Sequence, residues 1–170
     1  MKTSTLLFTI SAVAVLSLPS RAQESATATV TATIVAPIAI SKDIDMNFGN
    51  VAVQSSTGGT VVMTPAGVRS TTGGVTLPTT TGNVAAASFT VSGVDGYTYS
   101  ITLPTAAVTI TNTGGNTMTV TAFTSSPSGQ GTLTGGSETL TVGATLNVTA
   151  AQAPGTYVSA TPFAVTVNYD

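Results

Sequence analysis

Apolar and polar residues alternate with a period of two along much of the chain. Residues 89–103 show the alternation twice, first ahead of Asp95-Gly96 and again from Tyr97 onward. A period of two places every second side chain on one face of a strand, and Asp-Gly supplies the positive φ angles of a tight turn. The pattern therefore predicts a β-hairpin over residues 89–103, with Tyr97 and Tyr99 on its core face.

Further strands follow at short spacing. Residues 107–123 predict a second hairpin with its turn at residues 112–116, and residues 138–148 alternate with an expected break at Gly143. Residues 126–131 have the composition of a loop. Short strands at this spacing indicate an all-β fold, a sandwich or a barrel.

The stretch at residues 41–51 has two interpretations. Asp43, Asp45 and Asn47 have the spacing of oxygen ligands in a calcium loop. Such a loop also needs Gly at its sixth position and Glu at its twelfth, and neither is present. The residues that alternate with these three are apolar: Ile44, Met46 and Phe48. We therefore favour a half-buried strand, which Gly49 ends or bulges, over a metal site.

The N-terminus has the pattern of a secretory signal. Lys2 precedes an apolar run over residues 6–18, and Ser20-Arg21-Ala22 places small residues where a signal peptidase cleaves. A membrane helix is the alternative, but the run is shorter than the ~20 residues that a bilayer span needs. We predict a signal peptide at residues 1–22, one domain at residues 23–170, no membrane span, and a location in the periplasm, outside the cell or on its outer surface.

Charge is scarce, and Thr takes its place. The 170-residue chain contains 36 Thr, and residues 23–170 hold two cations, Lys42 and Arg69, against six anions, hence a net charge of −4. The anions are Glu24, Asp43, Asp45, Asp95, Glu138 and Asp170. Without clusters of Lys or Arg the protein is not expected to bind nucleic acid. One strand face carries hydroxyls in place of charges, which suits either solvent or close packing beside other copies.

The composition also argues against catalysis. The chain has no His and no Cys, which excludes Ser-His and Cys-His machinery as well as disulfides. Asp43 and Asp45 form the one close carboxylate pair, with no apolar pocket to separate their pKa values. Gly58-Gly59 and Gly73-Gly74 lack the Lys of a phosphate-binding loop. We expect a protein that is not an enzyme and needs no metal or cofactor.

Both ends of the mature chain alternate like pairing strands. Residues 24–35 would extend about 40 Å at ~3.3 Å per residue, enough to run the length of a small sandwich. The expected assembly strands present these apolar residues: Ala26, Ala28, Val30, Ala32, Ile34, Phe163, Val165, Val167 and Tyr169. A terminal strand of this kind either completes its own sheet or pairs with another chain, and the alternation fits both.

Four segments resemble an uncharacterised secreted bacterial family, the domain of unknown function four-four-zero-two: "APIAISKDIDMNFGNV", "GGTVVMTPAGVRST", "ASFTVSGVDGYTYSITLP" and "TLTVGATLNVTAAQAPGTYVSATPFAVTVNYD". The closing "GTYVSATPFAVTVNY" is similar to the ends of spore-coat-U-type and chaperone-usher fimbrial subunits. That resemblance implies that the strand ending at Tyr169 pairs with a periplasmic chaperone. It also implies that the fold is an antiparallel β-sandwich of the immunoglobulin-like or fimbrial type, and that the N-terminal extension completes the sandwich of a neighbouring subunit.

Two functional hypotheses follow. The first is a secreted structural or fimbria-like surface subunit that forms homo-oligomers or filaments by strand donation. The second is a monomeric immunoglobulin-like adhesion or carbohydrate-binding module, for which Tyr157 is the candidate aromatic because sugar sites present exposed rings. Calcium-dependent folding at Asp43, Asp45 and Asn47 is a third and weaker hypothesis.

Overall fold

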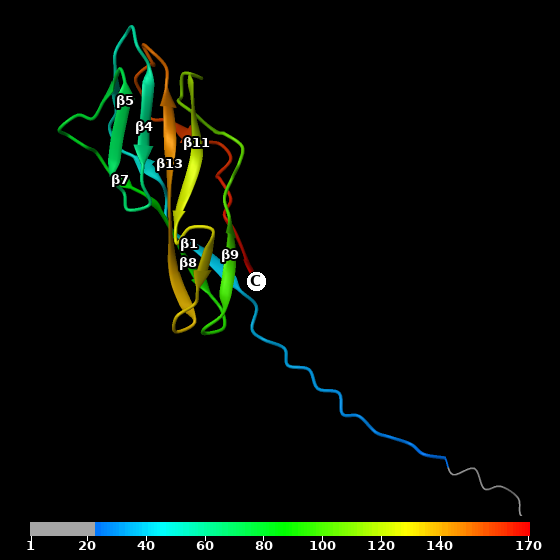
Figure 1. Cartoon of the computed structure of the whole chain (residues 1–170). Coiled ribbons are helices and arrows are strands. Elements are labelled where there is room, and N and C mark those ends of the chain that lie inside the picture. The colour runs from blue at the N-terminus through cyan, green and yellow to red at the C-terminus, as the bar shows by residue number, and fades with distance from the viewer. Residues whose placement is uncertain (1–22) are drawn as a thin grey trace, which may run out of the picture. The chain divides into compact units, whose positions relative to one another are not determined.

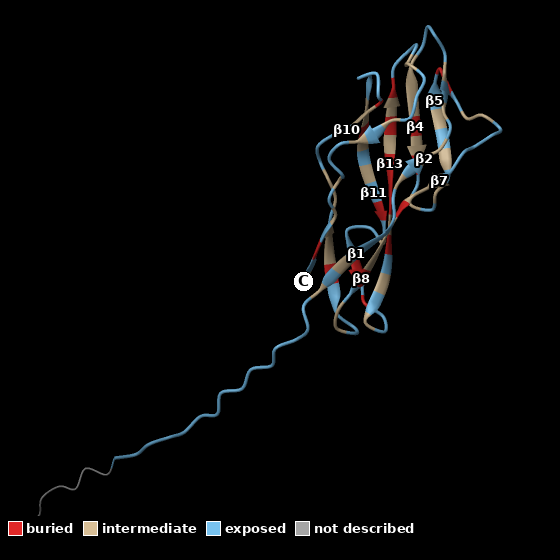
Figure 2. Ribbon diagram, turned by 180° about the vertical axis from the view of Figure 1, so that it is seen from behind, coloured by how far each residue is buried: buried red, intermediate tan, exposed pale blue. Residues whose placement is uncertain are grey.

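A computed structural model describes residues 23–170, so the predicted signal peptide lies outside the described residues. The chain divides into two units, Met1–Thr33 and Ile34–Asp170. The described part of the first unit, residues 23–33, has no strand and is exposed throughout (Figure 2). Every described strand belongs to the second unit, and residues 23–170 contain no helix.

The second unit is built from short strands. Those of the main sheet are β1 (Ala39–Ile44), β4 (Gly59–Met63), β5 (Arg69–Gly73), β8 (Ala87–Ser92), β10 (Val108–Thr111), β11 (Thr117–Ser126), β13 (Ser137–Val148) and β14 (Val158–Ser159). A second sheet contains β9 (Thr98–Thr102), β12 (Gln130–Thr132) and β15 (Thr166–Tyr169). Two small pairs join β2 (Asn47–Phe48) to β7 (Val84–Ala85) and β3 (Ala52–Val53) to β6 (Val75–Thr76). All pairings are antiparallel.

β13 organises the main sheet (Figure 1). One of its sides pairs with β11, while its other side pairs first with β8 and then with β4. We call the part of the unit built on residues 137–142 the lower half and the part built on residues 144–148 the upper half. β1 flanks β8 in the lower half, and β5 flanks β4 in the upper half.

The lower half is a closed two-layer sandwich. The sheet of β12, β9 and β15 covers the inner face of β8 and β13, and its core contains Tyr99, Leu133, Leu140 and Val142, all 0% exposed. Burying a side chain of this size stabilises the fold by ~1.5–3 kcal/mol. Tyr99 comes from β9, Leu140 and Val142 come from β13, and Leu133 directly follows β12, so this core ties both layers together.

The upper half has no long strand opposite its main sheet. Val61, Ala144 and Leu146 are buried there, but the layer that faces them consists of the two-residue strands β2, β3, β6 and β7 and the irregular residues 160–165. Two-residue strands cover little area, and this half of the sandwich is therefore less complete than the lower half.

The outer face of the main sheet carries the hydroxyl-rich surface. One row crosses five neighbouring strands, and it consists of Thr72, Thr60, Asn147, Thr119 and Thr109. Hydroxyls of Thr60 and Thr72 lie 2.8 Å apart, and Asn147 Nδ2 donates to Thr121 Oγ1 at 3.0 Å. Neighbouring strands thus satisfy one another's polar groups without charge.

The first predicted hairpin is wrong. β8 pairs with β1 and β13, whereas β9 pairs with β12 and β15, so the Asp95-Gly96 turn connects two different sheets. Tyr97 lies in the turn before β9 and is 41% exposed, while Tyr99 is fully buried as predicted. The turn chemistry is correct, since Gly96 has a φ of +77°, but such a turn does not fix the partner of each strand.

The second hairpin is confirmed, and the break at Gly143 is not. β10 pairs with β11 around a turn in which Asn112 N–H donates to Asn116 O. β13 continues through Gly143, where a Cβ would meet the backbone of residues 63–65, so this glycine permits a close approach of two strands. The loop predicted at residues 126–131 is shorter in the structure. Residues 127–129 carry no strand, whereas Ser126 ends β11 and residues 130–131 belong to β12.

The stretch at residues 41–51 is two strands instead of one. Its pairing shifts between Lys42 and Ile44, and the chain leaves the ladder before β2 begins. Ile44 is consequently 51% exposed, which contradicts its predicted place on a buried face, whereas Met46 and Phe48 pack on the upper core. Gly49, with a φ of +65°, directly follows β2, as predicted.

Candidate functional site: an apolar groove in the upper half

The upper half contains an open groove of about 1050 Å³. Its floor is the inner face of β10, β11 and β13, which contributes Val108, Ile110, Met118, Val120, Phe123 and Leu146. Alternation in each strand directs these side chains inward and the Thr side chains outward. Four of the six, Val108, Ile110, Met118 and Phe123, are only half-buried. The floor therefore resembles the interior of a sandwich that lacks part of its cover.

The two walls of the groove come from opposite ends of the described sequence. Residues 44–53 form one wall, and residues 152–159 with Pro162 and Phe163 form the other. Little regular pairing fixes either wall, because β2 and β3 in the first wall are only two residues long and residues 152–157 in the second carry no strand. The first and last parts of the domain thus border a gap in its inner layer.

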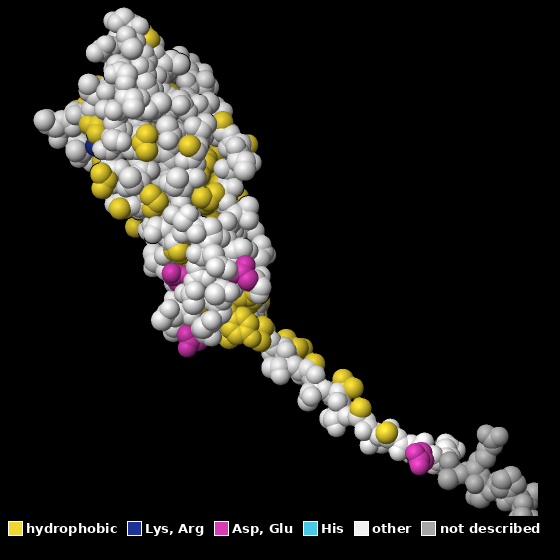
Figure 3. Space-filling model, in the orientation of Figure 1, with side chains coloured by type: hydrophobic (Ala, Val, Ile, Leu, Met, Phe, Trp, Pro, Cys, Tyr) yellow, Lys and Arg dark blue, Asp and Glu magenta, His cyan; other side chains and the backbone are white. Residues whose placement is uncertain are grey.

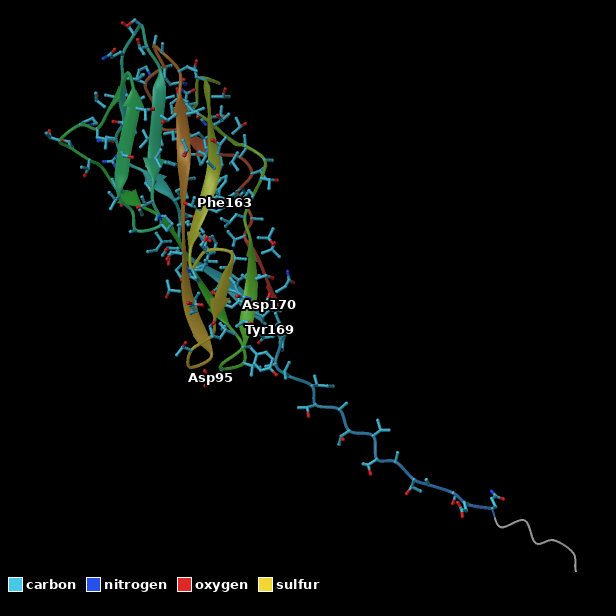
Figure 4. The ribbon with its side chains drawn as sticks, in the orientation of Figure 1. Asp95, Phe163, Tyr169 and Asp170 are labelled. Carbon is cyan, nitrogen blue, oxygen red and sulfur yellow. The ribbon has the colours of Figure 1, made fainter. Side chains whose placement is uncertain are left out.

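An aromatic cluster closes the groove at the boundary between the halves. The ring centroids of Phe123 and Phe163 lie 5.0 Å apart, and those of Phe89 and Phe163 lie 6.3 Å apart in an edge-on arrangement. Figure 4 shows Phe163 midway along the unit, between Asp95 at one end and the far end of β13. Below Phe163 the core is filled, and above it the groove begins.

Arg69 holds the first wall in place. Its guanidinium donates from Nη1 to the carbonyl oxygen of Phe48 and, at 3.1 Å, to that of Asn50. Gly49 lies between these carbonyls with a Cβ position already occupied by Thr81 O. Charge-assisted bonds of this kind are stronger than neutral ones, so a wall with little pairing is still fixed. Nothing in the sequence predicts this contact, because a single Arg in a Thr-rich strand indicates only exposure.

Tyr157 belongs to the second wall. Its hydroxyl donates to the carbonyl oxygen of Ala153 at 2.6 Å and accepts from Gln152 Nε2 at 2.8 Å. The ring is half-buried, and its polar tip is bonded within the wall. Tyr157 therefore does not form an exposed platform for a sugar ring.

The predicted N-terminal assembly strand is an exposed arm. Residues 23–38 carry no strand, and Val30 and Ile34 are 93% and 96% exposed, with Ala26, Ala28 and Ala32 exposed as well. The apolar face that the alternation predicts for this segment is therefore uncovered within the described chain.

The C-terminal assembly residues pack on the lower core. Val167 is buried, and Phe163, Val165 and Tyr169 contact the same cluster. β15 itself pairs only with β9 among the described strands, so its other side is an edge. The alternation of residues 163–169 thus marks a face that packs on the core, although Phe163 and Val165 precede β15, and pairing of this segment with another chain stays a prediction.

The acidic residues do not converge on a metal site. Lys42 Nζ lies 2.8 Å from Asp45 Oδ2, Thr90 Oγ1 donates to Asp43 Oδ2 at 2.8 Å, and Asn47 Oδ1 accepts from Gly49 N–H. No group of three or more acidic residues that could hold a metal occurs within residues 23–170.

A buried phenol and carboxylate pair lies in the lower half. Tyr99 donates to Glu138 Oε2 at 2.9 Å, and Thr132 N–H donates to the same oxygen at 3.0 Å. Burial first, and then the hydrogen bond and negative charge of Glu138, raise the pKa of Tyr99 well above its ordinary value. The phenol is fully enclosed, which suits a structural role.

Comparison with known families matches residues 38–169 to the domain of unknown function DUF4402. The chain belongs to the DUF4402 family. The match begins one residue before β1 and ends with β15, so this DUF4402 domain comprises both walls of the groove and excludes the exposed arm. No curated protein and no solved structure matches the chain. Among the described residues of this DUF4402 protein, no helix is long and apolar enough to cross a bilayer.

Proposed function

We propose that this DUF4402 protein is a secreted, non-catalytic structural subunit of the cell surface, fimbria-like in assembling by donation of a β-strand. One observation carries the proposal: an apolar groove lies between residues 44–53 and residues 152–163, and the same chain holds an exposed arm with the alternation of a strand. The arm, residues 26–34, is the donated strand, and the groove of a second copy accepts it.

The physical driving force is the same on both sides. Half-buried side chains on the groove floor and nearly fully exposed Val30 and Ile34 all gain by leaving water, at ~25 cal/mol for each Å² of apolar surface. A donated strand also offers main-chain hydrogen bonds to wall segments that lack a ladder. Because donor and acceptor surfaces differ, the contact is heterologous and repeats from copy to copy as a filament.

Small and large side chains are matched in this scheme. The groove is lined by Phe and Met side chains that already fill part of it, while the arm presents Ala at three of its five apolar positions. Ala at those positions fits beneath bulky walls, and Val30 and Ile34 supply most of the buried area.

Deletion of residues 24–33 tests the proposal while leaving the second unit intact. The full chain is expected to form oligomers or filaments in sedimentation and electron microscopy, and the deleted chain is expected to stay monomeric. A peptide of residues 24–35 is expected to bind the deleted chain. Assembly of the deleted chain would contradict the proposal.

A matched pair of charge substitutions tests the alternation itself. Val30→Asp places a carboxylate on the apolar face of the arm and is expected to prevent assembly, since a charge in the groove would be unpaired. Thr31→Asp adds the same charge one position along, on the opposite face, and is expected to leave assembly intact. A protein that stays monomeric in every form and binds glycans would instead favour an adhesion or carbohydrate-binding module.

A further inference from the structure

The exposed large apolar residues of the described chain are not scattered. Val30 and Ile34 belong to the arm, Val68 lies in the turn between β4 and β5, and the rest form two sets. Val35 and Tyr97, which are 40% and 41% exposed, form what we call the collar. Ile44 and Val158, 51% and 63% exposed, line the groove.

The collar is held on a rigid support. Val94 N–H donates to the hydroxyl of Tyr169 at 2.7 Å, and that hydroxyl donates to the carbonyl oxygen of Ala36 at 3.2 Å. The ring of Tyr169 packs edge-on to Tyr97 with 5.3 Å between centroids. One side chain therefore joins the turn that carries Tyr97 to the backbone next to Val35.

Close packing reinforces this support. A Cβ on Gly93 would collide with the Tyr169 hydroxyl, so no larger residue fits there without moving the ring. Figure 4 shows Tyr169 and Asp170 near Asp95, at the end of the unit away from the groove. Figure 3 shows hydrophobic side chains gathered at that same end, where the first residues of the second unit lie. The collar is thus a preformed apolar surface.

Strand registers place Val158 at the opposite end of the unit. Val158 pairs with Thr111, Thr111 pairs with Thr117, and the neighbouring Thr119 pairs with Asn147, the penultimate residue of β13. Ile44 lies lower, because it pairs with Ser88, which pairs with Thr141 near the middle of β13. Val158 therefore marks the far end of the groove, and Ile44 its end near the boundary between the halves.

We infer that the collar is a second contact between copies, which packs on the far end of the neighbour's groove beside Val158. The inference rests on the proposed function. Ile34 is the first residue of the second unit, so a copy whose arm is inserted brings its collar to one end of the acceptor groove. The acceptor's own lower half occupies the space beyond the other end. The arm therefore enters from the far end and runs antiparallel to residues 160–165.

Disulfide trapping tests the contact, because the chain has no Cys of its own. In V35C/V158C each copy carries one thiol on the collar and one at the far end of the groove. Oxidation of the assembled protein is expected to give a ladder of covalent multimers on a non-reducing gel. V35C/I44C is the control for the reverse direction and is expected to give no ladder.

The outcomes separate this inference from the proposed function. A ladder from V35C/I44C, or filaments in which neither pair cross-links, would overturn the collar contact while leaving strand donation in place. A wild-type chain that never assembles would overturn the proposed function and this inference with it.

A pair of valines provides a matched control that adds no thiol. Val158 and Val68 are 63% and 64% exposed, but only Val158 lies at the proposed contact. Val158→Thr is expected to raise the concentration needed for half-maximal assembly several-fold, and Val68→Thr is expected to leave it unchanged. Equal effects of the two substitutions would contradict the contact.

Discussion

At the scale of the residue, Tyr99 shows how a polar group enters a core without charge neutralisation by a cation. Its ring is fully buried, and its hydroxyl donates to Glu138, which also accepts from Thr132 N–H. The carboxylate is satisfied by two donors, and the phenol gains a partner in place of water. The pKa of Tyr99 is raised first by burial, which disfavours the charged phenolate, and then by the hydrogen bond to Glu138 and the negative charge of that carboxylate.

This raised pKa predicts a pH dependence of stability. The neutral phenol is favoured in the folded state, so its contribution is present in full below the unfolded pKa of ~10 and is lost as the pH rises above that value. The free energy of unfolding in urea is expected to fall more steeply between pH 9 and pH 11 for the wild type than for Tyr99→Phe. Tyr157→Phe is the control and is expected to retain the wild-type slope; an unchanged slope in Tyr99→Phe would contradict the prediction.

Two glycines, Gly96 and Gly93, are needed for different reasons. Gly96 has a positive φ and open space around it, so its role is conformational. Gly93 has no such φ, yet the Tyr169 hydroxyl occupies the place of its Cβ. The turn therefore requires Gly96, and the packing against Tyr169 requires Gly93.

At the scale of the element, β13 belongs to two environments. Its first half lies in a closed core, where Leu140 is 0% exposed, and its second half lies on the floor of the groove beside Ile110. A cavity created in a closed core cannot be filled, whereas a truncation in the groove floor only enlarges a space that is already open. Half-buried residues of the groove floor, such as Ile110 on β10, are therefore expected to tolerate truncation better than Leu140 on β13.

Two substitutions measure this difference. Leu140→Ala is expected to lower the free energy of unfolding by ~2–5 kcal/mol, as for a buried leucine in a packed core. Ile110→Ala is expected to cost less in a chain that lacks residues 24–33, because Ile110 is only half-buried there, and to weaken assembly of the full chain. Denaturation with urea gives the first quantity, and sedimentation gives the second. A larger loss for Ile110→Ala in the deleted chain would show that the groove is not open.

At the scale of the whole molecule, the open groove couples the free energy of unfolding to the binding of a ligand. A ligand that occupies the folded state alone stabilises it by RT ln(1 + [L]/Kd). The arm is such a ligand when it comes from another copy, and one chain then carries both the ligand and its site. The chain's low charge suits this arrangement, since 6% charged residues leave little repulsion between packed copies.

The arm peptide allows this linkage to be measured. The chain without residues 24–33 is expected to melt at a temperature that does not depend on its own concentration. A peptide of residues 24–35 at a hundred times its Kd is expected to add ~2.7 kcal/mol to the free energy of unfolding. A peptide in which Val30 and Ile34 are replaced by Ser is the control. Equal stabilisation by the two peptides would show that side chains do not enter the groove.

Local chemistry explains which elements were predictable. The turn at residues 112–116 joins two strands that also pair with each other, so the hairpin was correct. The Asp95-Gly96 turn is just as clear in the sequence, but Tyr97 falls outside the strand, and the two segments join different sheets. Strand pairing depends on which residues across the molecule cover each face, and a turn motif contains no information about them.

The sequence by itself determined the all-β class, the outward Thr face, the alternating arm and the apolar face that ends at Tyr169, because each follows from a period of two and from side-chain polarity. Only the tertiary structure decided that β13 passes unbroken through Gly143, that Arg69 fixes the carbonyls of Phe48 and Asn50, and that the upper half lacks cover. The physical reason is that one face of a sheet is buried only when a second layer of the fold covers it. The alternation along a strand shows which of its faces is apolar, and the packing of distant strands decides whether that face is covered.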